Sequence, residues 1–295
     1  MRKTQNQLNL LGLAAGAIMI SFSGVWVKIS NVTPTVSAFY RVFFGGVILL
    51  VMALVRREVK WQGRKNALFI LICGFFFALD LVFYHYSIHL VGPGLGTILP
   101  NFQVFILSAV GVFILKEKMR LTFLAAVPLA ITGLFLIVGF QWRGLEISYR
   151  MGIASGLAAA LCYTCFLLFL RNLQSGQAGK SRFYVLMIVS LVSALFLAAE
   201  VLRTGASFQI PDMQSLVALV ALGGISQAVG WLFIINALPG IRASLSGLIL
   251  LLQPSLAFVW DVLLFKRPTT TMNWVGVGLA LAAIYLGTVQ SSKQS

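Results

Sequence analysis

Charge is scarce in this chain of 295 residues, and acidic charge is the scarcest kind. Charged residues make up 10% of the sequence, with 7 acidic side chains against 22 basic ones. Soluble domains carry about 25% charged residues. The composition therefore excludes an ordinary soluble domain.

Histidine and cysteine are also few, at two and three residues. The cysteines all lie inside apolar stretches, which favours small packing groups over redox chemistry. The acidic residues in or near these stretches are Asp80, Glu200, Asp212 and Asp261. They are scattered, and no phosphate-binding glycine pattern accompanies them. We therefore expect no metal, no cofactor and no catalytic residue.

Long apolar runs take the place of charge. Most are long enough to cross about 30 Å of hydrocarbon as a helix, and none shows the alternation of a barrel strand. Ten such runs cover residues 8–29, 36–55, 67–90, 94–115, 121–139, 150–171, 182–202, 214–237, 243–265 and 271–289. The sequence thus predicts an all-α integral membrane protein with ten transmembrane helices.

The second half of the chain repeats the first. Gln103 and Gln253 occupy matching apolar runs, and the residues around them are similar. Five spans are an odd number, so a second set of five runs in the opposite sense. The pattern predicts two inverted five-helix repeats, over residues 1–145 and 146–295, which is typical of transporters whose site lies between the repeats.

The basic residues give the orientation. With the N-terminus inside, they collect in the inner connections, such as 56–65, 116–120 and 171–182. Lys116 is then inside and its repeat mate Lys266 outside. A cytoplasmic excess of lysine and arginine is the rule for membrane proteins, so both termini are expected in the cytoplasm. The net charge of +15 therefore predicts orientation in a bilayer and no nucleic-acid partner.

Glycines mark expected helix contacts and one expected turn. Gly12 and Gly16 in the first span, like Gly152 and Gly156 in the sixth, have the four-residue spacing that permits close helix approach. We expect packing inside a monomer, with a weak homodimer as the other use. The glycines of residues 92–96 predict a tight turn between the third and fourth spans.

Four short motifs stand out in or beside the predicted spans: FSGVWVK at 22–28, AFYR at 38–41, LKEKM at 115–119 and LQP at 252–254. In their order and spacing they resemble the drug/metabolite transporter superfamily, in its EamA-type branch. The chain departs from that pattern at Lys116, where the family has glycine, at Val104, where the repeat places proline, and at Arg267, where glutamate is usual.

The resemblance implies a secondary transporter of small organic metabolites working by alternating access in a bacterial inner membrane. Amino acids, nucleosides and related amphipathic compounds are the expected substrates, and export is favoured over uptake or exchange. No nucleotide-hydrolysis motif is present, so a gradient must supply the energy. An intramembrane lipid-processing enzyme is the alternative of another class.

Ionisable groups inside spans are costly and usually functional. Arg41 is expected to bind an anionic substrate group, or else to form a structural ion pair with Asp80 or Asp261. Asp80 lies near mid-bilayer and is a candidate for substrate binding and proton coupling. His85 is a second candidate for proton coupling, with a plain helix contact as its alternative.

Paired amides form the second set of candidates. Gln103 and Gln253 lie near the middle of related spans and can grip a polar substrate, or hydrogen-bond between helices for about 1 kcal/mol. Pro254 frees the carbonyl of Leu250 and predicts a bend there. Other mid-span residues expected to line the substrate site are Trp26, Tyr40, Tyr84, Asn101 and Trp231.

Overall fold

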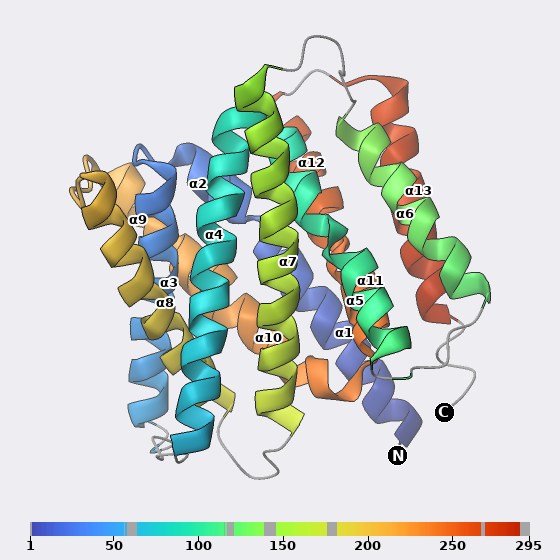
Figure 1. Cartoon of the computed structure of the whole chain (residues 1–295), viewed down its shortest axis with the longest axis horizontal. Helices are drawn as coiled ribbons and strands as arrows, with labels where there is room; N and C mark the ends of the chain where they lie inside the picture. Colours follow the sequence, from blue (N-terminus) through green and yellow to red (C-terminus); the bar gives the residue numbers. More distant parts are fainter. Residues whose placement is uncertain are drawn as a thin grey trace.

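The structure is a computed structural model that describes residues 2–55, 57, 64–114, 116, 121–138, 146–175, 182–266 and 269–289. Its regular structure in these ranges is helical (Figure 1). The first half forms α1 (Arg2–Ser21), α2 (Ser23–Ile29), α3 (Pro34–Val55), α4 (Arg64–Ile98), the 3-10 turn η1 (Leu99–Phe102), α5 (Gln103–Phe113) and α6 (Leu121–Val138). The second half forms α7 (Ile147–Ser175), α8 (Arg182–Thr204), α9 (Met213–Ala221), the π-helical η2 (Leu222–Gly230), α10 (Trp231–Ala237), η3 (Leu238–Gly240), α11 (Ala243–Leu250), α12 (Leu252–Phe265) and α13 (Thr271–Val289).

Length and composition confirm a helical membrane protein. Within the described residues, seven helical segments can cross a bilayer, over 5–29, 34–55, 67–87, 147–173, 184–204, 213–240 and 245–265. The other three predicted spans, over α5, α6 and α13, stay predictions. Helix α1 begins and α13 ends on the same side of the bundle, the lower side in Figure 1, as an even number of spans requires.

The two halves pack in a pattern that is unchanged when they are exchanged. Helices at the same position in the two halves pack on each other: α3 on α8 at the second position, α5 on α11 at the fourth and α6 on α13 at the fifth. The third span of each half packs on the first span of the other, as α4 with α7 and α10 with α1. This is the contact pattern of two halves related by an approximate two-fold axis.

The helix is interrupted close to Pro254, where the sequence predicts a bend. Helix α11 ends at Leu250 and α12 begins at Leu252, because the proline ring cannot coexist with an unbroken helical bond to the carbonyl four residues earlier. The repeat-related place in the first half is also broken, by η1 at Leu99–Phe102. Both breaks lie directly beside the paired glutamines.

The glycines of residues 92–96 predict a tight turn, and the chain does reverse direction across them. A β-carbon at Gly156 would lie 2.8 Å from Ser87 Oγ and would overlap Leu99 Cβ, so Ser87 and Leu99 lie close together. A straight α-helix from Ser87 to Leu99 would hold them about 18 Å apart. The reversal therefore falls between these two residues, although helical backbone is assigned as far as Ile98.

The repeat also appears in backbone conformation. Lys116 and Lys266, which the 150-residue offset relates, have φ of 53° and 52°. This left-handed conformation ends a helix and favours glycine, which the resembled family has at the first of these positions. The shared geometry explains why the family pattern places glycine there.

On the side opposite the termini, hydrogen bonds join connections from the two halves. The Asn31 amide donates to the Asp212 carboxylate at 2.9 Å, and Asp212 caps α9 by accepting from the Ser215 backbone N–H at 2.7 Å. Donation by Asn31 holds the pKa of the Asp212 carboxyl below its usual value. The Tyr40 hydroxyl donates to the Phe208 carbonyl at 2.6 Å.

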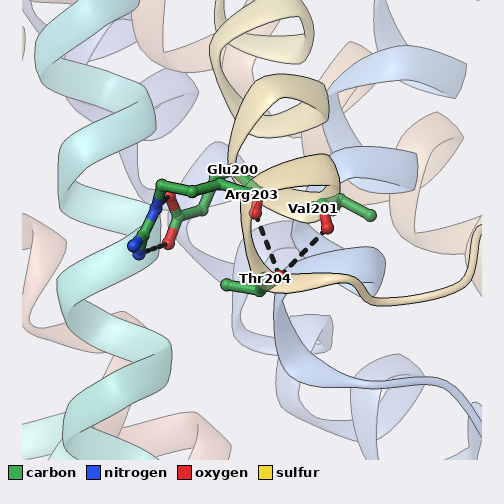
Figure 2. A network of polar contacts seen from close by, with 4 residues as sticks. All are labelled: Glu200, Val201, Arg203 and Thr204. Carbon is green, nitrogen blue, oxygen red and sulfur yellow. Dashed lines mark hydrogen bonds and ion pairs between the residues drawn. The ribbon is translucent and has the colours of Figure 1, made fainter.

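Helix α8 ends on the same side in a compact polar network (Figure 2). Arg203 donates twice to Glu200, at 2.7 Å for each bond, and the Thr204 hydroxyl donates to the carbonyls of Glu200 and Val201. Gly205 follows with φ of +67°, which closes the helix in the left-handed conformation. This network ends α8 with its two charged groups paired to each other.

Gly16 confirms the predicted close approach of helices. A β-carbon there would lie 2.7 Å from the carbonyl oxygen of Gly230 and from Cγ1 of Ile234, whereas one at Gly12 would meet nothing nearer than 3.9 Å. Gly156 likewise packs on Leu99 and on the Ser87 hydroxyl. The predicted glycine pairs therefore include one position per half that permits close packing of spans.

We expect Gly16→Ala to destabilise the protein by about 1–3 kcal/mol, the usual result of overpacking. The measurement is the apparent Tm of detergent-purified protein, taken as the temperature at which the protein loses monodispersity. Gly12→Ala, one turn away on the same helix, is the matched control and should leave Tm unchanged or raise it, since alanine favours helix. Equal Tm values for the two variants would contradict the close contact.

Candidate functional site

Two opposite charges are buried within the membrane-spanning helices. Arg41 on α3 and Asp80 on α4 are 9% and 7% exposed. They lie within electrostatic range of each other and of Tyr84 and Tyr163. Among the described residues no direct ion pair joins the two charges. The guanidinium and the carboxylate are therefore within electrostatic range of each other but do not bond directly.

A chain of hydrogen bonds holds the arginine. Its Nε donates to the Gln227 side-chain oxygen at 3.3 Å, and the Gln227 amide donates to the Ser190 hydroxyl at 3.0 Å. Gln227 and Ser190 are fully buried. The chain joins α3, η2 and α8. We call Arg41, Asp80, Tyr84, Tyr163 and Gln227 the polar cluster.

Gln253 also reaches this cluster. Its amide lies beside the Tyr163 hydroxyl, yet its buried Nε2 makes no hydrogen bond of good geometry within the described part of the chain. Gln253 lies two residues after the break at Leu251, between α11 and α12. Buried polar atoms nearly always have a partner, from protein, water or ligand. An unsatisfied donor here favours a ligand or a water.

Three aromatic side chains pack together about one helical turn from members of the polar cluster. Phe77 stacks on Phe166 with ring centroids 4.3 Å apart, and Trp231 meets Phe166 edge-on at 4.9 Å. All three are at most 2% exposed. Each lies three or four residues from a member of the polar cluster on its own stretch of helix. We call these three residues the aromatic cluster.

Trp231, expected from the sequence to line the substrate site, lies beside the polar cluster, with its ring 6.2 Å from that of Tyr163. Its indole Nε1 has no hydrogen-bond partner within the described residues. His85 is 5% exposed and within electrostatic range of Arg41, and its Nδ1 also lacks a partner in that part of the chain. Both residues therefore present spare polar atoms near the cluster.

The remaining candidates lie elsewhere or serve other contacts. Gln103 is 1% exposed, and neither its amide nitrogen nor its oxygen has a partner in the described chain. Trp26 on α2 has a buried Nε1 that also lacks a hydrogen-bond partner among the described residues. Asn101 is half-buried in η1. Tyr40 uses its hydroxyl on the Phe208 carbonyl, so a structural bond occupies it.

The alternative that paired Arg41 with Asp261 is wrong. Asp261 binds Lys28 instead, with Nζ 2.7 Å from Oδ1, and the ammonium also lies 4.0 Å from the centre of the Phe265 ring. This pair joins α2 to α12 on the side opposite the termini. It is reinforced where Trp260 stacks on Phe22 at 4.4 Å and donates to the Ser21 hydroxyl at 2.8 Å.

Sequence reasoning did not select Gln227, Ser190 or the Lys28–Asp261 pair as site or contact residues. These contacts join residues 186, 37 and 233 positions apart. Gln227 had one available signal, its position as an amide in the middle of an apolar span. Nothing in the sequence connected it to Arg41.

The model of the EamA-like transporter family matches residues 7–139 and again 150–289. The chain belongs to the EamA-like transporter family. The two matches fall in the two predicted repeats. An EamA-like transporter is not an enzyme, so the lipid-processing alternative is excluded.

One curated relative of this EamA-like transporter is a "Probable amino-acid metabolite efflux pump" of Salmonella typhimurium (strain LT2). It is 24% identical over 207 residues, which cover 65% of this chain and 66%, just under two thirds, of the relative. A crystal structure of another protein shares the fold, with a TM-score of 0.80 and 16% identity over 97% of this chain and 99% of that one. At that identity the likeness shows the fold alone.

We expect the Lys28–Asp261 pair to contribute about 0.2–1 kcal/mol, because both side chains are partly exposed. Lys28→Asp and Asp261→Lys should each lower the apparent Tm of this EamA-like transporter. The charge-swapped double variant should recover most of the loss. A double variant with the summed loss of the two single variants would show that the pair contributes nothing.

Proposed function

We propose that this EamA-like transporter moves small zwitterionic metabolites, amino acids or close relatives, by binding them between Arg41 and Asp80. The observation that carries the proposal is a buried guanidinium and a buried carboxylate that lie within electrostatic range of each other without a direct ion pair. Buried charges need partners, and ionisable groups inside a membrane protein by default mark a substrate or ion pathway. A zwitterion supplies both missing partners at once.

The chemistry of the surrounding groups fits such a ligand. A guanidinium binds a carboxylate through parallel N–H···O bonds, and Asp80 can accept from an ammonium group. Tyr84, Tyr163 and Gln253 add neutral hydrogen-bonding groups. The aromatic cluster offers an apolar surface to a side chain. A neutral nucleoside would leave both charges unpaired, so the site favours amino acids among the predicted substrates.

The helix breaks support alternating access. In transporters with inverted repeats, discontinuous helices form the site near the bilayer midplane and the repeats move about it. Here breaks occur at η1 and at Leu251, beside Gln103 and Gln253, in halves whose contacts are related by two-fold exchange. We therefore infer ten spans in two inverted repeats, working as a monomer or weak homodimer.

Export is the direction we propose, in a bacterial inner membrane with both termini in the cytoplasm. The name of the Salmonella relative supports efflux of amino-acid metabolites. Uptake and exchange use the same fold and differ only in the gradients that drive them. Transport is coupled to proton movement in this proposal, with Asp80 as the group that takes up the proton and His85 as a second candidate nearby.

The test is transport by purified protein in liposomes, against a panel of three matched solutes: an amino acid, its decarboxylated amine and its deaminated acid. We expect the amino acid to be preferred over both by about 10–100-fold in kcat/KM, since each lost charged hydrogen bond is worth about 1.5–3 kcal/mol. Arg41→Gln should abolish discrimination against the amine, and Asp80→Asn discrimination against the acid.

Asp80→Asn should also remove the dependence of transport on a pH gradient. Glu200→Gln is the control, because it removes an acid of the α8 end that bonds to Arg203 rather than to the polar cluster. Equal transport of the three solutes by the unmodified protein would refute the zwitterion site. Unchanged pH dependence in Asp80→Asn would refute proton coupling alone.

A further inference from the structure

Gln227 uses both ends of its amide in the fully buried region beside the candidate site. The oxygen accepts from Arg41 Nε at 3.3 Å, and the nitrogen donates to Ser190 at 3.0 Å. A guanidinium has five N–H groups. The bond at Nε therefore fixes the orientation of the group and does not use the N–H groups of its Nη atoms.

The π-helical segment η2 carries Gln227. In a π-helix each N–H bonds five residues back, and such turns are rare and frequent at functional sites. The segment η2 spans Leu222–Gly230 and lies between α9 and α10. The altered helical repeat changes the direction in which Gln227 leaves the helix. A backbone feature of this kind is costly unless its surroundings fix it.

Backbone contact with α3 fixes it here. A β-carbon at Gly45 would lie 2.7 Å from Gln227 Cβ and 3.0 Å from the Gly223 carbonyl oxygen, and one at Gly223 would lie 2.9 Å from the Gly45 nitrogen. Gly45 follows Arg41 by four residues and so shares its face of α3. The two glycines therefore let η2 approach α3 closely at the turn that carries the arginine.

We propose that Gln227 is the positioning residue of the substrate site: it orients the Arg41 guanidinium so that its Nη edge meets the substrate carboxylate. This rests on the proposed function. A neutral amide is the group that can do this without cancelling the charge. A carboxylate at the same place would pair with the guanidinium and compete with the substrate.

The experiment compares KM and kcat for the amino acid and its decarboxylated amine in Gln227→Glu, Gln227→Met and Ser190→Ala. Gln227→Glu should raise KM for the amino acid at least about 10-fold, the loss of one charged hydrogen bond, while KM for the amine stays level or falls. Gln227→Met should raise KM for the amino acid with kcat within about 3-fold, and Ser190→Ala should have a smaller effect in the same direction.

Gly45→Ala tests the same idea without altering a polar group. Its β-carbon must displace Gln227, so KM for the amino acid should rise as in Gln227→Met. Gly224→Ala is the matched control on η2, since its β-carbon would meet only Ile48 Cδ1 at 3.5 Å, an ordinary contact.

Unmodified protein that fails to discriminate the amino acid from its amine would refute the proposed function itself. If that discrimination is present but unchanged in Gln227→Glu, or if KM rises equally for both solutes, the positioning role is wrong and the function stands. Should Gln227→Glu fail to fold, Gly45→Ala against Gly224→Ala decides the question.

Discussion

A charged guanidinium buried between transmembrane helices is the constraint around which this structure is organised. Lipid and apolar side chains cannot solvate such a group, and its burial is tolerated only with hydrogen bonds and counter-charge nearby. Arg41 has such a bond, to Gln227, and a counter-charge in range, Asp80. The π-helical turn, the two close glycines and the buried serine all serve that one group.

The scaffold is symmetric, but the chemistry is not. Helix breaks, left-handed lysines and helix pairings recur in both halves. Both buried charges of the polar cluster come from the first half, whereas Gln227, Tyr163 and Gln253 come from the second. In the proposed mechanism, movement of one half against the other would therefore change the neutral groups that surround a fixed pair of charges.

Features that depend on a few neighbouring residues could be predicted from the sequence. Apolar length predicted the spans, Pro254 the break, and small residues the close approach at Gly16. The partner of Asp261 and the role of Gln227 were not predictable, since these contacts join residues far apart in the chain.

The close contact between Gly45 and Gly223 also limits how this protein can diversify. Two helices that touch through their backbones cannot accept a larger residue at either position without moving the arginine. Single substitutions at Gly45 or Gly223, beside Gln227, are therefore not tolerated without a shift of the backbone. Tyr84, Tyr163 and Gln253 reach the cluster through their side chains, so in the proposed site these are the positions where substitutions can change substrate preference without moving the backbone.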